Sequence, residues 1–371
     1  MTDRNSNIEI LRIISILLII AYHATRMQSI QQKGSVFASV IGILFGSWGI
    51  LGVDVFVIIC AWFSVEKNLN TKKLFSIVFQ TFIYLLISAI ISFIYDIVNT
   101  QNIIESIKDI ILHVNQSIWE PLWSKHYWFV TAYLFLMIVS PYINKIIHSL
   151  SKENYKKLIV ILSFIPFFSQ FNVYTNTVSD IACFAYIYFV TGYLKIYGDS
   201  IIDKLRAKKW FVIISLIIIA SNLILLIPGL FDPIFTLLSN TTAATVRHSV
   251  IMFFDALALF ILVIKYKPKN NPNINMLSSF VFGVYLFHSM NIIGFDGDIL
   301  DLLMKELSRI GWLNSNIWFP FEYILLVLFV FISGVLFDAI RKNIIQKPIE
   351  KRIYNKFELK FEKINSYFNM C

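Results

Sequence analysis

The stretch Arg12–His23, RIISILLIIAYH, is an apolar run with a cation at one end and an imidazole at the other. Eleven residues of α-helix turn through three full turns plus about 20° and rise about 16 Å, so Arg12 and His23 share one helix face. A charge at mid-bilayer costs at least about 2.5–3.5 kcal/mol on insertion scales, which makes both residues functional candidates. The alternatives are a lipid-headgroup anchor for Arg12 and a packed, hydrogen-bonded His23.

The composition around this stretch is that of a membrane protein. Of the 371 residues, 57% are hydrophobic and 15% are charged, and the mean hydropathy is +0.69. Average soluble domains carry about 25% charged residues. Apolar runs near the roughly 20 residues needed to cross a bilayer recur along the chain, without the alternation of a membrane β-barrel. The sequence therefore predicts an all-α, polytopic bundle of membrane helices.

We predict about ten transmembrane helices in a single domain. Residues 1–345 are expected to form the transmembrane domain and residues 346–371 a basic cytoplasmic tail that anchors on the inner membrane surface. No signal-peptide cleavage site closes the first apolar run, so this run is interpreted as the first span. The predicted spans are 8–27, 41–64, 73–97, 126–146, 157–171, 180–197, 210–228, 248–265, 276–295 and 317–340.

The charged loops predict the orientation. Alternate loops are rich in Lys and Arg, and all but seven of the 32 Lys and Arg residues fall on one side of the predicted spans. The positive-inside rule then places both termini in the cytoplasm. The net charge of +9 is explained by this topology and by attraction to anionic lipid, so nucleic acid is not an expected partner. Cys60, Cys183 and Cys371 have no metal-site or redox spacing, and no metal is predicted.

Further polar residues lie in or beside the predicted spans. Asp54, in GVDVFVIICAWF, has no cation nearby in the sequence, so its carboxylate either orients an imidazole from another helix or tethers two helices. His288, in FGVYLFHSM, is either a substrate-binding residue or a packed, hydrogen-bonded one. The fourth predicted span begins with His126, Tyr127 and Trp128. These residues either bind substrate or belong to the aromatic belt that is usual at a membrane interface.

Taken together, these features resemble the acyltransferase-3 family of integral-membrane acyltransferases, which are built on ten helices. Arg12, ten intervening residues and His23 match the Arg/Lys–ten residues–His signature of that family. GVDVFVIICAWF, YWFVTAYLFLMIVSPYIN and FGVYLFHSM follow in the expected order. The chain departs from the family at Cys60-Ala61, where a Ser-Gly pair is usual, and at NTKKLFSI, where many members carry Arg-x-x-Arg.

The resemblance implies an enzyme of the bacterial plasma membrane. Such an enzyme moves an acyl group, usually acetyl, from cytoplasmic acetyl-CoA to a hydroxyl of an extracytoplasmic cell-surface polysaccharide or its lipid-linked precursor. The implied partners are the lipid bilayer, acyl-CoA, the glycan acceptor and other polysaccharide-assembly proteins. The use of Ile, Asn and Lys is typical of an AT-rich bacterial genome.

The resemblance also suggests a role for each candidate residue. His23 is expected to be the catalytic base, with Arg12 and Asp54 as further catalytic residues. Lys72 and Lys73 take the place of the family's arginine pair and are expected to hold the CoA phosphates together with Arg12. The predicted glycan-binding residues are His126, Tyr127, Trp128 and His288.

The main alternative from another functional class is a transporter or flippase for a lipid-linked oligosaccharide. A transporter would have the same number of membrane spans, the same aromatic residues at the start of the fourth span, and the same charged residues within the membrane. Transporters commonly contain internal repeats, whereas the Arg12–His23 spacing does not recur in the second half of the chain. A glycan polymerase is a further alternative, although it needs no cytoplasmic CoA site.

The predicted topology can be checked by cysteine accessibility. Cysteines introduced near Asp109 and Asp298 are expected to be labelled from outside the cell, and cysteines near Lys208 and Lys356 only after permeabilisation, because the Lys- and Arg-rich loops stay in the cytoplasm. Labelling of the 208 and 298 sites from the same side would contradict this topology.

Overall fold

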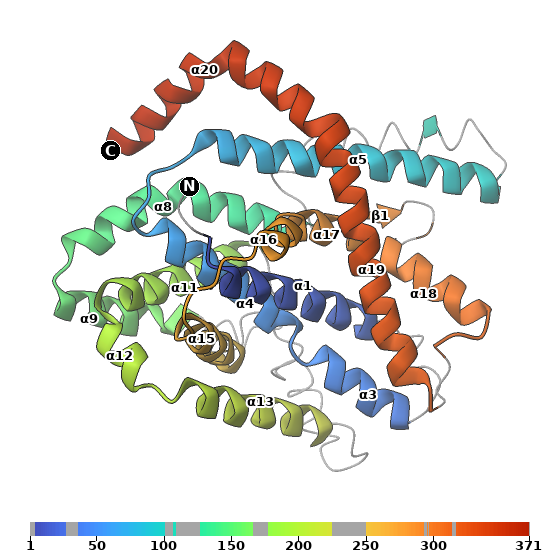
Figure 1. Ribbon diagram of the computed structural model, residues 1–371, viewed down its shortest axis with the longest axis horizontal. Coiled ribbons are helices and arrows are strands. Elements are labelled where there is room, and N and C mark those ends of the chain that lie inside the picture. The colour runs from blue at the N-terminus through green and yellow to red at the C-terminus, as the bar shows by residue number, and fades with distance from the viewer. Residues whose placement is uncertain are drawn as a thin grey trace.

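A computed structural model describes residues 4–26, 36–100, 107–108, 127–165, 177–224, 250–292, 295, 297–313 and 317–370. Within these ranges the chain is almost entirely helical (Figure 1). The strands described are β1 (Asn291–Ile292) and β2 (Gly297–Asp298), which pair antiparallel. The predicted all-α class is confirmed.

Several helices have the length and apolar composition of membrane spans. Among the described residues five segments qualify: four coincide with the first four predicted spans, and the fifth, Phe319–Phe368, covers the tenth and continues through the C-terminal helix. They contain α1 (Ser6–Arg26), α3 (Val36–Gly46) with α4 (Gly49–Ser64), α5 (Thr71–Thr100), α8 (Trp128–Ser149) and α19 (Phe319–Arg341). The sixth to eighth predicted spans contain the helices α11 (Thr177–Tyr197), α13 (Ala207–Ile224) and α15 (Val250–Ile264). The total of ten spans and the orientation therefore stay predictions.

The prediction that residues 276–295 form a single span is wrong. α16 (Pro272–Ser278) ends early in this range, α17 (Val281–His288) follows, and the chain then enters β1. The backbone beyond α17 finds its partners elsewhere: β1 pairs with β2, and the carbonyl of Asn291 accepts a hydrogen bond from the Ser88 hydroxyl of α5. A hydropathy profile shows only that the pieces are apolar and does not reveal these distant partners.

A second break lies before α18 (Ile299–Arg309). Asp298 caps this helix by accepting from the backbone N–H of Asp301, and the Asp301 carboxylate accepts from the backbone N–H of Asp298. Burial, together with the neighbouring Asp301 carboxylate, raises the pKa of Asp298 to about 7. The two acids thus begin a helix, which gives this acidic loop a local structural role.

Two glycines bring α1 and α4 close together. A Cβ added to Gly52 would lie 2.5 Å from the carbonyl oxygen of Ser15, and one added to Gly49 would lie 2.2 Å from the Cβ of Tyr22. The two helices run antiparallel, and small residues are what allow membrane helices to approach in this way. α4 also packs against α11 and α15, so it lies at the centre of the bundle.

A buried ion pair holds α19 against α5. The guanidinium of Arg341 lies 2.7 Å from the carboxylate of Asp338, and both side chains are about 2% exposed or less. The same carboxylate accepts hydrogen bonds from Gln80 (3.1 Å) and from the Tyr84 hydroxyl (3.0 Å) of α5. Each polar group is therefore satisfied inside the bundle, as a low-dielectric interior requires.

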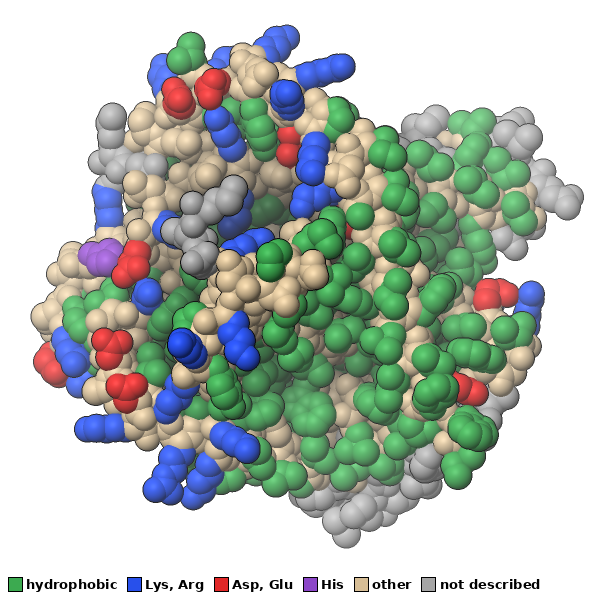
Figure 2. Space-filling model, in the orientation of Figure 1, with side chains coloured by type: hydrophobic (Ala, Val, Ile, Leu, Met, Phe, Trp, Pro, Cys, Tyr) green, Lys and Arg blue, Asp and Glu red, His purple; other side chains and the backbone are tan. Residues whose placement is uncertain are grey.

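The C-terminal segment is helical and packs on the protein. α19 continues through a π-helical turn, η1 (Lys342–Gln346), into α20 (Lys347–Met370), which lies along the beginning of α5 (Figure 1). The Tyr354 hydroxyl donates to the carbonyl of Lys72 (2.9 Å), and the Asn365 amide oxygen accepts from the backbone N–H of Thr71 (2.9 Å). Both termini lie on the side of the molecule where many Lys and Arg side chains gather, whereas the opposite side is largely apolar (Figure 2). The membrane-anchoring role of this tail stays a prediction.

Further connecting helices complete the described chain. They are α9 (Lys152–Leu162), which covers the start of the fifth predicted span, and α12 (Asp199–Lys204), which precedes α13. The end of the fifth predicted span lies outside the described residues.

The α1–α4 contact yields a stability prediction. Gly52→Ala is expected to destabilise the protein by about 1–3 kcal/mol, because the new methyl group meets backbone and the helices must separate. Thermal unfolding of the purified protein in detergent measures this loss. Gly334→Ala is the matched control, since its Cβ would find its nearest atoms at 3.2 Å, on Val284. Equal losses in the two variants would contradict the close approach at Gly52.

Candidate active site

Two histidines from distant parts of the chain meet in the bundle. His23, near the end of α1, and His288, the last residue of α17, have ring centroids 5.0 Å apart at an interplanar angle of 59°. His288 is fully buried, whereas His23 is half-buried. The structure therefore brings the predicted catalytic residue into contact with one of the predicted glycan-binding residues.

The hydrogen bonds of His288 fix its ring. Its Nδ1 lies 3.1 Å from the carbonyl oxygen of Val284, and its Nε2 lies 3.1 Å from the Ser289 hydroxyl. A carbonyl only accepts, so Nδ1 carries the proton in this arrangement, and Nε2 of the neutral ring accepts from Ser289. His288 is held in one orientation from both sides. Of the two rings, His23 is the one that a substrate can approach.

Tyrosines surround the histidine pair. Tyr22 packs edge-on against His23 with ring centroids 5.8 Å apart, and Tyr285 packs edge-on against His288 at 5.7 Å. Tyr285 was not singled out from the sequence. It lies three residues before His288 on α17, so helix periodicity alone places it on nearly the same face. The pair thus sits in an aromatic setting with polar hydroxyl groups.

The glycan-binding residues predicted at the start of α8 have different surroundings in the structure. Tyr127 joins the site: its hydroxyl donates to the carbonyl of Leu286 (3.0 Å), and its ring lies 6.2 Å from that of Tyr285. The half-buried Trp128 contacts the ring of Phe184 on α11. His126 lies outside the described residues.

Asp54 is buried in α4, with 1% of its surface exposed. It follows Gly52, which faces α1, by two residues and therefore lies about 200° around the helix from it. Asp54 consequently lies on the side of α4 that faces away from α1. This direction disfavours direct contact between its carboxylate and the His23 ring, and a supporting role of Asp54 stays a prediction.

Arg12 is held in an ion pair near the beginning of α1. Its guanidinium lies 3.1 Å from the carboxylate of Glu9, which is itself buried and also accepts from the Ser278 hydroxyl of α16. About a quarter of the Arg12 side chain remains accessible, at 27%. α1 is continuous from Ser6 to Arg26, so the shared face of Arg12 and His23 holds in the structure.

The two adjacent lysines of α5 have different surroundings. Lys72 pairs with Glu358 of α20 at 3.2 Å. Lys73 is exposed, its backbone N–H donates to the Asn70 amide oxygen (3.1 Å), and within the described residues its ammonium group forms no ion pair. Neighbouring helical residues point about 100° apart, so the two lysines meet different groups, and their joint binding of the CoA phosphates stays a prediction. Lys73 is therefore the one of these two lysines whose charge is not engaged by a carboxylate of the described residues.

Comparison with known proteins gives one match. A family model described as an acyltransferase domain, that of acyltransferase family 3, matches residues 5–338. Neither a search of curated proteins nor a search of solved structures gives a match. The matched range includes Arg12, His23, Asp54, Lys73 and His288.

Proposed function

The chain belongs to the acyltransferase-3 family and is a multi-pass membrane acyltransferase, and we propose that it is an O-acetyltransferase of the bacterial plasma membrane. In this proposal the acetyl group comes from cytoplasmic acetyl-CoA. The acceptor is a hydroxyl of an extracytoplasmic cell-surface polysaccharide or of its lipid-linked precursor.

The contact between His23 and His288 carries the proposal. Acyl transfer from a thioester to a hydroxyl needs a general base, and histidine titrates near neutral pH. His23 accepts the hydroxyl proton while the oxygen attacks the thioester carbonyl and a new C–O bond forms. The C–S bond then breaks, and the imidazolium returns the proton to the departing sulfur. General base catalysis of this kind typically contributes 10²–10⁴ in rate.

His288 acts as a positioning residue in this mechanism. Its ring packs against His23 at 5.0 Å and is itself fixed by Val284 and Ser289. Because a neutral neighbour adds no charge, it does not oppose protonation of His23 as a second imidazolium would. The ring of His23 is thus held in position by its packing against His288.

The donor and acceptor approach from opposite ends of α1. Arg12 and Lys73 supply positive charge for the CoA phosphates, and the rise of α1 places His23 about 16 Å from Arg12. An extended pantetheine arm can cover that distance. The half-buried Tyr22 beside His23 offers a ring and a hydroxyl to a sugar.

Removal of the base tests the proposed function. His23→Asn is expected to lower acetylation of the surface glycan by about 10²–10⁴ with normal protein levels, because the ring nitrogen that accepts the proton is lost. The acetyl content of the glycan, measured by NMR or mass spectrometry in cells, is the readout. His148→Asn is the control, since His148 is exposed on α8 and bonds the carbonyl of Val65. Wild-type acetylation by the His23→Asn variant would contradict the mechanism. Loss of the glycan itself from the cell surface would favour the alternative function, a flippase for a lipid-linked oligosaccharide.

Single lysine variants test the donor end. Lys73→Ala is expected to raise the KM for acetyl-CoA by up to about fivefold with little change in kcat, since a partly screened charge contributes at most about 1 kcal/mol. The effect should grow at low ionic strength. Lys72→Ala is the matched variant and should change KM less, because Lys72 is paired with Glu358. A larger effect at Lys72 would overturn the assignment of Lys73.

A further inference from the structure

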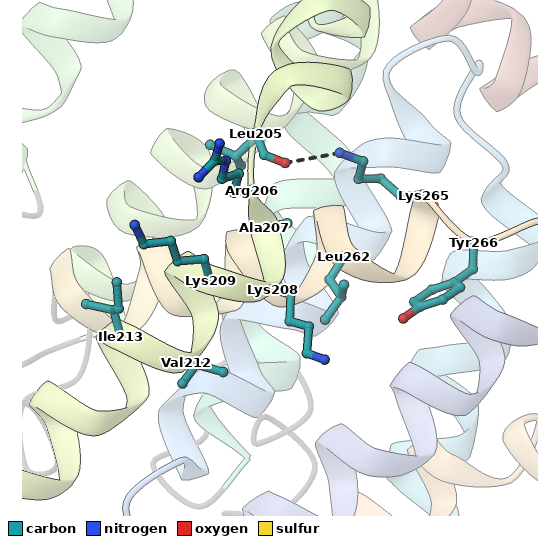
Figure 3. A pocket seen from close by; sticks show the side chains of 10 residues that line it. All are labelled: Leu205, Arg206, Ala207, Lys208, Lys209, Val212, Ile213, Leu262, Lys265 and Tyr266. Atoms are coloured by element: carbon teal, nitrogen blue, oxygen red, sulfur yellow. Dashed lines mark hydrogen bonds between the residues drawn. The ribbon is translucent and has the colours of Figure 1, made fainter.

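An open groove of about 710 Å³ lies between the beginning of α13 and the end of α15 (Figure 3). Its volume falls within the range of about 300–1,000 Å³ that is usual for small-molecule sites. None of its lining residues belongs to the histidine site. Basic side chains border it together with Val212, Ile213, Leu262 and Tyr266.

The walls of the groove are fastened to each other. The ammonium group of Lys265, just after α15, donates to the carbonyl oxygen of Leu205 at 3.0 Å (Figure 3) and to that of Asp203, also at 3.0 Å. These carbonyls belong to the end of α12 and the connection to α13. The positive charge of Lys265 is therefore engaged in holding the groove together, and Ala207 is buried beneath the connection.

Among the described residues, no carboxylate pairs with the remaining cations of the groove. Arg206, Lys208 and Lys209 follow one another closely and are all exposed. Lys208 extends toward Leu262 and Tyr266, while Arg206 and Lys209 extend to the other side of the same turn (Figure 3). A cluster of three such cations attracts an anion.

The surface next to these cations is apolar. Val212 and Leu216 follow Lys208 at intervals of four residues, so the three side chains form one stripe along α13. Val212 and Leu216 are 45% and 59% exposed. The stripe therefore passes from positive charge to exposed hydrocarbon within about 12 Å. A ligand that satisfies the whole stripe carries an anionic group and an apolar chain.

We propose that this groove binds an anionic phospholipid of the surrounding bilayer. The lipid phosphate lies at Lys208, Arg206 and Lys209 add positive charge on the other side of the same turn, and one acyl chain runs along Val212 and the groove wall at Leu262. Tyr266, which is 60% exposed, places its hydroxyl at headgroup level, where tyrosine is commonly found in membrane proteins. Basic pockets between membrane helices are known settings for anionic headgroups. A free phosphate ion would leave the apolar part of the stripe uncovered.

Native mass spectrometry of the full chain in detergent tests the proposal. Titration with phosphatidylglycerol is expected to give bound lipid at lower concentration than titration with phosphatidylcholine. The double variant Lys208→Gln/Lys209→Gln should bind phosphatidylglycerol about thirtyfold more weakly, since each basic residue near a membrane surface contributes about fivefold. The control is Lys145→Gln/Lys157→Gln, which removes the same charge from two exposed lysines outside the groove.

Three outcomes would overturn the proposal. The first is an equal loss of lipid in the two double variants, which would reflect net charge alone. The second is displacement of phosphatidylglycerol by inorganic phosphate at equal concentration, which would show a simple anion site. The third is equally effective displacement by acetyl-CoA, which would make the groove a donor site. The measurement does not depend on enzymatic activity, so its result is separate from that of the histidine variant.

Discussion

The close approach of α1 and α4 is the constraint on which the site depends. In lipid the hydrophobic effect does not press helices together, so contact relies on small residues and on polar groups that find partners. Gly49 and Gly52 remove the side chains that would separate the two helices. α1 is thereby held in the middle of the bundle, where it also contacts α17 and α19. Its position against α17 is what allows the His23 ring to meet the His288 ring.

Buried polar groups fasten the more distant helices to this centre. The Asp338 carboxylate joins Arg341 of its own helix to Gln80 and Tyr84 of α5. Glu9 plays the same part between α1 and α16, through its hydrogen bond from Ser278. In a low-dielectric interior such groups are costly when unpaired, so each fixes a particular arrangement of helices. The arrangement of helices around the histidine pair is thus supported by buried polar contacts.

Sequence reasoning was strongest where a feature is local. The shared face of Arg12 and His23 follows from helix geometry and holds because α1 is continuous. The meeting of His23 with His288 depends on tertiary packing, which no local spacing contains. The break in the ninth predicted span was missed because hydropathy measures only how apolar a segment is. It does not reveal that the backbone after α17 pairs with β2 instead of continuing the helix. The divergence of Lys72 and Lys73, by contrast, follows from the 100° step between neighbouring helical residues and was available from the sequence.

The contact between α20 and α5 has an evolutionary consequence. The family match ends at residue 338, so α20 lies wholly beyond it, whereas the beginning of α5 lies within it. Glu358 nevertheless pairs with Lys72, and Phe361 packs against Phe75. Relatives that keep such a tail are expected to vary these pairs together, while relatives without it leave the same positions of α5 free to drift. The tail thus packs on the part of the chain that the family model matches.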